Sequence, residues 1–127
     1  MKVFDLHCDT LSELRYAEKA GAPKSFAEND LHIDLQKLKK GDYMLQCFAA
    51  FVNLGDKTPG ADPLVTALEE IDVFKRIMAK YPDRIAPVYT ACLLYTSVRD
   101  MPLTVILDAH GGDLYQSGPA AYLESET

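Results

Sequence analysis

The chain has 127 residues, of which 48% are hydrophobic, so it has room for one ordinary domain with a buried core. Its formal net charge of −6 and its pI near 4.9 argue against nucleic acid and anionic membrane surfaces as partners. No apolar run approaches the ~20 residues that a membrane-spanning helix needs, and acidic residues stand where the apolar part of a signal peptide would lie, so we expect a cytoplasmic protein with reduced cysteines.

The hydrophobic pattern predicts strands and helices in alternation. In chain order the expected elements are a strand at 2–6, a helix at 11–21, a short helix at 35–41, a strand at 43–52, a long helix at 63–81 and a short strand at 84–91. Residues typical of helix ends flank the three helices: Thr10 or Ser12, Asp34 and Asp62 as N-caps, and Gly21, Gly41 and Pro82 as stops.

One predicted strand is apolar along its whole length. The run YMLQCFAAFV, residues 43–52, has Gln46 as its one clearly polar residue, whereas a strand with one wet face would alternate. A strand that is buried on both faces is typical of a parallel sheet covered by helices. The order of elements therefore predicts an α/β sheet or barrel with right-handed crossovers.

A histidine and an aspartate follow the first strand in the sequence FDLHCDT. His7 and Asp9 stand two residues apart where the strand ends, so their side chains converge if the chain turns there. Imidazole and carboxylate groups suit zinc or a similar divalent ion, and functional groups of α/β barrels gather at the carboxyl ends of the strands. The pair is therefore a candidate metal site, and strand alternation would turn Cys8 away from it into the core.

A second pair with the same spacing has a simpler explanation. His32 and Asp34 stand in LHIDLQ, directly before the predicted short helix. Asp34 is suited to capping that helix. We therefore interpret His32 as a solvated loop residue and Asp34 as a cap.

Several linked segments resemble one known family. FDLHCDTLSEL, followed by HIDLQKLKKGDYMLQCFAAFV, is similar to the membrane dipeptidase (renal dipeptidase) family of zinc peptidases in its bacterial form. That family opens with D-x-H-x-D-T/L, continues with DL-x-x-L-x-x-G, and follows with a strand Q-F/C-F-A-x-F/Y-V. YPDRIAPVYTA resembles the next unit of the same proteins, so the resemblance covers residues 1–91.

The resemblance implies a fold, a reaction and two site residues. The fold would be the N-terminal part of a (β/α)₈ barrel of the metal-dependent hydrolases, incomplete at this length. His7 and Asp9 would be the first two ligands of a centre with two Zn²⁺ ions that hydrolyses dipeptides. In the family the other ligands and the proton-handling residue come from later strands, so we assign no catalytic residue here. The partner is then a dipeptide substrate, and a homodimer is open for the full-length parent.

The resemblance predicts a boundary near residue 91. We expect 1–91 to be a fragment of the dipeptidase barrel and 92–127 to be an unrelated or artefactual tail. CLLYTS, residues 92–97, is what a sequencing-adapter sequence encodes, which indicates a chimera. We accordingly expect the tail to make few contacts with the rest, and the fragment to fold poorly and to be inactive.

Two other functions stay open. The tail segment PLTVILDAHGGD predicts a buried strand that runs into a turn, and its His110 and Asp113 would complete a different metal hydrolase together with His7. The second alternative is a non-catalytic α/β module that binds no metal and tolerates His7→Ala.

Overall fold

The computed structural model describes residues 1–52 and 62–88, together with the backbone of residues 104–111. Its elements in chain order are β1 (Val3–Asp5), α1 (Thr10–Lys19), α2 (Leu35–Lys40), β2 (Tyr43–Val52), α3 (Pro63–Lys80), β3 (Ala86–Pro87) and β4 (Thr104–Gly111). Each predicted element is present, and the α/β class is confirmed. The last part of the predicted strand at 84–91 lies outside the described residues.

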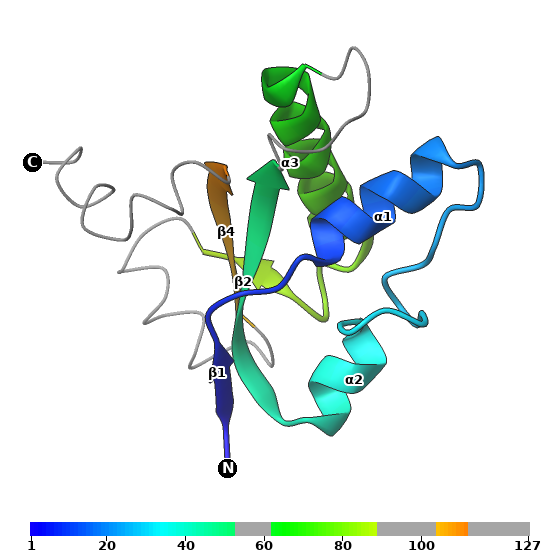
Figure 1. The fold of residues 1–127 in the computed structure, drawn as a ribbon. Coiled ribbons are helices and arrows are strands. Elements are labelled where there is room, and N and C mark those ends of the chain that lie inside the picture. Colours follow the sequence, from blue (N-terminus) through cyan, green and yellow to red (C-terminus); the bar gives the residue numbers. More distant parts are fainter. Residues whose placement is uncertain (53–61, 89–103, 112–127) are drawn as a thin grey trace, which may run out of the picture.

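The four strands form one parallel sheet. Their order is β1-β2-β4-β3, so β4 lies between β2 and β3 although it follows both in the chain. The helices α1, α2 and α3 lie on one face of this sheet (Figure 1). Because all the strands run in the same direction, their carboxyl ends meet at one edge.

The position of β4 corrects an expectation about the segment after Ala91. The strand pairs with β2 along its whole length, from Leu45 opposite Thr104 to Val52 opposite Gly111. The expectation of few contacts is therefore wrong for Thr104–Gly111. The run TVIL is apolar and rich in β-branched residues, which suits an interior strand of a parallel sheet. The separate origin of residues 92–127 stays a prediction, and CLLYTS lies outside the described residues.

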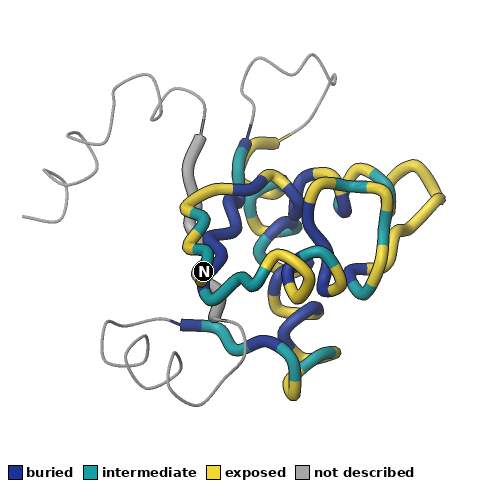
Figure 2. Tube along the Cα trace, turned by 90° about the horizontal axis from the view of Figure 1, so that it is seen from below, coloured by how far each residue is buried: buried dark blue, intermediate teal, exposed yellow. Residues whose placement is uncertain are grey.

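The core lies between β2 and the helices, with Phe48 at its centre. Phe48 is fully buried and makes edge-to-face contacts with two rings. The ring centroids of Phe26 and Phe74 lie 5.7 Å and 6.1 Å from that of Phe48. The buried residues gather where the helices face the sheet, and the exposed ones lie mainly on the outer turns (Figure 2).

The apolar residues of α3 are only partly buried. Asp62 caps this helix by accepting hydrogen bonds from the backbone N–H groups of Leu64 (2.8 Å) and Val65 (3.4 Å), as predicted. However, Leu64 and Leu68, which share the apolar periodicity of the helix in the sequence, are exposed. The helix turns Phe74 and its neighbours toward β2, and this places Leu64 and Leu68 outside that contact. No helix in the described parts of the chain is long and apolar enough to cross a membrane.

The first helix begins one residue earlier than predicted. Its N-cap is Asp9, whose side chain makes no capping hydrogen bond, while Thr10 and Ser12 lie inside α1 and are buried. The predicted stop at Gly21 is confirmed, because this residue has a φ of 74°, a left-handed conformation that glycine adopts without a Cβ clash.

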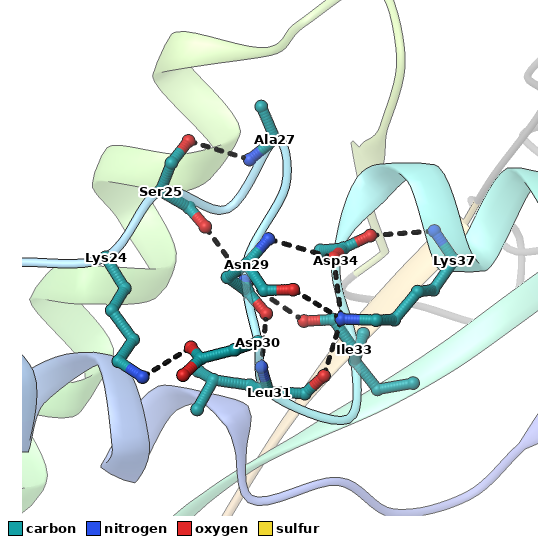
Figure 3. A network of polar contacts seen from close by, with 9 residues as sticks. All are labelled: Lys24, Ser25, Ala27, Asn29, Asp30, Leu31, Ile33, Asp34 and Lys37. Carbon is teal, nitrogen blue, oxygen red and sulfur yellow. Dashed lines mark hydrogen bonds and ion pairs between the residues drawn. The ribbon is translucent and has the colours of Figure 1, made fainter.

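A buried aspartate organises the connection between α1 and α2 (Figure 3). Oδ1 of Asp34 accepts a hydrogen bond from the backbone N–H of Lys37 (2.7 Å), and Oδ2 accepts from the backbone N–H of Asn29 (3.0 Å) and from Lys37 Nζ (2.8 Å). Burial acts to raise the pKa of Asp34, but the hydrogen bonds from Lys37 and Asn29 outweigh it and leave the pKa below its ordinary value. The predicted cap is confirmed, and His32 is exposed as expected.

Ion pairs fix α1 against α3. Arg15 Nε lies 2.7 Å from Glu69 Oε2, and both terminal nitrogens of Arg76 contact the carboxylate of Glu18, at 2.8 Å and 2.9 Å. The two-pronged contact of Arg76 has the geometry that favours an arginine–carboxylate pair. These contacts join α1, whose N-cap is Asp9, to α3.

Candidate metal centre

His7 and Asp9 lie in the short segment between β1, which ends at Asp5, and the start of α1. This segment stays attached to β2, because the carbonyl oxygen of Cys8 accepts a hydrogen bond from the backbone N–H of Ala49 (3.0 Å). Both residues therefore lie at the carboxyl end of β1, at the same edge as the end of β2. The predicted location is confirmed.

The two side chains are close enough to share one metal ion. His7 Nε2 lies 3.1 Å from Asp9 Oδ1, and the side chains are 47% and 57% exposed. Zinc–ligand bonds of about 2.0–2.2 Å at tetrahedral angles place neighbouring donor atoms about 3.3–3.6 Å apart. At 3.1 Å the two side chains are hydrogen-bonded to each other, so a zinc ion would need them to move apart slightly, while their nitrogen and oxygen donors suit zinc in kind.

Cys8, between the two residues, is unsuited to bind a metal here. Burial raises the pKa of its thiol to about 11, and the charges of Asp5 and Asp9 act in the same direction, against hydrogen bonds from Thr10. The thiolate is the form of cysteine that binds metals, and at neutral pH this group stays protonated. Cys8 is buried within the core, as strand alternation predicts.

Negative charge surrounds this edge of the sheet. Asp5 accepts a hydrogen bond of 3.4 Å from the backbone N–H of His7, so its carboxylate lies beside the segment. Carboxylates at Asp5 and Asp9 both favour a cation over an anion at this position. The contact of Asp5 is with the backbone of His7, so Asp5 shapes the turn.

His7 and Asp9 do not form a complete site with other described residues. Within residues 1–52 and 62–88, no group of three or more His, Cys, Asp or Glu side chains could hold a metal ion. The register of β4 places His110 opposite Phe51 and Asp108 opposite Ala49, near the same edge of the sheet. Asp113 lies outside the described residues.

A buried acid that the sequence did not lead us to expect lies behind this edge. Glu70, on α3, is fully buried and accepts a hydrogen bond from Ser12 Oγ on α1 (3.1 Å). Next to Glu69 it looks like part of a solvated face. Its spacing of four from Phe74 and seven from Ile77 places it in the buried stripe, which was the available signal.

The fold places the chain among α/β proteins whose polar groups gather at the carboxyl edge of a parallel sheet. The sequence model of the membrane dipeptidase family (peptidase family M19) matches residues 1–123 of this chain. The chain therefore belongs to the membrane dipeptidase family, a family of hydrolases. The match continues past Ala91, and the predicted boundary there stays a prediction.

A solved structure with a similar fold is a metallo peptidase from Rhodobacter sphaeroides liganded with a phosphinate mimic of the dipeptide L-Ala-D-Ala. The TM-score is 0.69 at 18% sequence identity, and the match covers 99% of this chain. The chain spans 43% of the length of that protein, which agrees with the predicted incomplete barrel. No curated protein matches the chain.

Proposed function

We propose that the chain is part of a metal-dependent dipeptidase in which His7 and Asp9 bind zinc. The observation that carries the proposal is the 3.1 Å separation between His7 Nε2 and Asp9 Oδ1 at the carboxyl edge of the sheet. Membership of the membrane dipeptidase family supports it. The resemblance to that family implies a complete site with two zinc ions, whose other ligands would come from outside the described ranges.

Each residue has a distinct part in the proposed site. His7 supplies a neutral imidazole nitrogen, and Asp9 supplies an anionic oxygen that partly balances the charge of the metal. A bound zinc ion would polarise the carbonyl group of the substrate and lower the pKa of a water molecule. The N-cap position of Asp9 on α1 and the hydrogen bond between Cys8 and Ala49 hold the two ligands in place.

A dipeptide is the proposed substrate. The similar metallo peptidase holds a dipeptide mimic, and this supports the same class of substrate here. The other proposals for the complete protein are a cytoplasmic location and a homodimer.

Zinc affinity tests the two proposed ligands. We expect His7→Ala to weaken zinc binding by at least about 100-fold, because a lost ligand should cost more than the 10–100-fold typical of outer-shell partners. Isothermal titration calorimetry of the wild-type chain and the variant measures this. His32→Ala is the matched control, because His32 also stands two residues before an aspartate and is exposed. Equal affinity in the wild type and His7→Ala would contradict the proposal.

The position of β4 favours a second candidate, a different metal hydrolase that His110 completes. In this case His110→Ala would lower zinc affinity as strongly as His7→Ala does. The support is the parallel register that brings His110 to the level of Phe51 near the carboxyl edge. If neither substitution changes zinc uptake, the non-catalytic module remains.

We expect the 127-residue chain to show no dipeptidase activity by itself. His7 and Asp9 supply two ligands, whereas a catalytic zinc normally has three protein ligands. The measurement is hydrolysis of an alanyl dipeptide by the purified chain with added zinc. Metal-dependent hydrolysis that His7→Ala abolishes would show that this chain carries a working site, and would overturn the expectation.

A further inference from the structure

A buried hydrogen-bonded group links three elements behind the candidate metal centre. Glu70 on α3 is 0% exposed. Ser12 Oγ lies 3.1 Å from Glu70 Oε1 and 3.4 Å from the carbonyl oxygen of Phe51. Ser12 stands in the first turn of α1, three residues after Asp9, and Phe51 precedes the last residue of β2. The group therefore joins α3, the start of α1 and the carboxyl end of β2.

The Ser12 hydroxyl has one proton and two acceptors within reach. A hydroxyl group donates a single hydrogen bond. When Glu70 is ionised, its carboxylate is the stronger acceptor, so Ser12 donates to it. When Glu70 is protonated, its O–H donates to Ser12 Oγ, and Ser12 can donate to the carbonyl oxygen of Phe51. The proton on Glu70 thus decides the direction of the chain of hydrogen bonds.

The surroundings of Glu70 raise its pKa, so the exchange of hydrogen bonds falls close to neutral pH. Burial raises the pKa of Glu70 to about 7, although hydrogen bonds from Ser12 and the backbone of Phe51 oppose it. Among the described residues, Oε2 of Glu70 has no hydrogen-bond partner. A buried carboxylate oxygen without a donor disfavours the charged form. Both protonation states are therefore populated in the neutral range.

The charged groups around Glu70 come from both helices. Arg15 on α1 lowers the pKa of Glu70, and Asp9 at the N-cap of α1 raises it. Arg15 is itself paired with Glu69, the neighbour of Glu70 on α3, at 2.7 Å. The strand β2 carries no charged side chain, so it contributes backbone groups alone.

We propose that Glu70 and Ser12 are positioning residues, whose hydrogen bonds set how the start of α1, and with it Asp9, lies against the end of β2. With Glu70 protonated, the chain of bonds runs from Glu70 through Ser12 to Phe51 and connects α1 to β2. With Glu70 ionised, Ser12 connects α1 to α3, and the backbone of Phe51, which also hydrogen-bonds the Glu70 carboxylate, keeps α3 joined to β2. The inference rests on the proposed function for its effect on metal binding, whereas the exchange of hydrogen bonds does not depend on a metal.

Carbon-13 NMR of the metal-free 127-residue chain tests the exchange. From about pH 5 to about pH 9, around the perturbed range of a buried carboxyl group, we follow the side-chain carboxyl carbon of Glu70 and the carbonyl carbon of Phe51. Both signals should titrate with one midpoint. In Glu70→Gln the amide donates to Ser12 as the protonated acid does, so the Phe51 signal should keep its low-pH position throughout.

A second variant keeps this test decisive. In Ser12→Ala the Phe51 signal should lose its pH dependence, while Glu70 still titrates. A Phe51 carbonyl signal that does not titrate in the wild type overturns the inference. A Phe51 carbonyl signal that titrates in Glu70→Gln as it does in the wild type also overturns the inference.

Zinc affinity then tests the positioning role. The ratio of the zinc dissociation constants of the wild type and Glu70→Gln cancels any pH dependence that both share. We expect a ratio near one at low pH, changing by about tenfold above the Glu70 midpoint, the lower end of the range for outer-shell partners. A constant ratio overturns the positioning role. Absence of zinc binding in both proteins overturns the proposed function and this role together, and the metal-free titration tells that result apart from a failure of the hydrogen-bond exchange.

Discussion

Replacing Phe48 with alanine should lower the free energy of unfolding by about 3–5 kcal/mol, the usual cost of removing a large aromatic side chain from a core. The ring is fully buried and contacts Phe26 and Phe74, which come from the loop before α2 and from α3. The cavity left by the missing ring would therefore separate Phe26 and Phe74 from β2. Urea unfolding followed by far-UV circular dichroism measures the change, and a cooperative transition of the wild-type chain would itself contradict the expectation that the fragment folds poorly.

Phe4→Ala is the matched control for this substitution. Phe4 lies on β1 in the same sheet, but its side chain is 55% exposed. Its removal leaves no enclosed cavity, so the loss should be much smaller than at Phe48. Equal losses at the two positions would show that the packing between β2 and the helices does not hold the fold together.

Replacing Asp34 with alanine should cost about 2–4 kcal/mol, since it removes a helix cap and leaves polar groups in a buried place without their acceptor. Asp34 is 1% exposed and accepts three hydrogen bonds, from Asn29 and Lys37. The lost bonds would loosen the connection that carries Phe26 onto Phe48. The same urea experiment measures the effect.

The control for Asp34 is Asp30→Ala in the same loop. Asp30 pairs with Lys24 but is exposed, so its loss should change stability little. Equal effects of Asp30→Ala and Asp34→Ala would contradict the role given to the buried cap.

Lowering the pH should remove the contribution of the Asp34 carboxylate to the free energy of unfolding. Its pKa is lowered in the folded state, so its stabilisation is present above the ordinary pKa and is lost as the pH falls through the folded value. Asp34→Ala should therefore flatten the acid limb of the stability curve. An unchanged acid limb would show that the Asp34 carboxylate does not drive this loss.

Local signals in the sequence were sufficient to predict most helices and strands. Asp34 and Asp62 cap their helices as expected, and Gly21 ends α1 in a left-handed conformation. These features depend on neighbours within a few residues, so the sequence carries them directly. The location of His7 and Asp9 at the end of β1 was predictable for the same reason, since a strand end is a local feature.

The exposed and buried faces of α3 were less predictable. Leu64 and Leu68 follow the same periodicity as Phe74, yet they are exposed, while Glu70 is buried. A periodic pattern identifies a helix and its apolar side, but the width and extent of the contact depend on which elements pack against it. Glu70 is buried because Ser12 on α1 and the end of β2 pack against it.

By itself the sequence determined the elements, their caps and the candidate pair His7 and Asp9, because periodicity, capping and strand ends are short-range properties. Only the tertiary structure decided that β4 lies between β2 and β3, and that Glu70 reaches Ser12 and the end of β2. Strand order and the burial of a single acid depend on contacts between residues far apart in the chain. No local pattern encodes these contacts, because many pairings of the same elements would satisfy it.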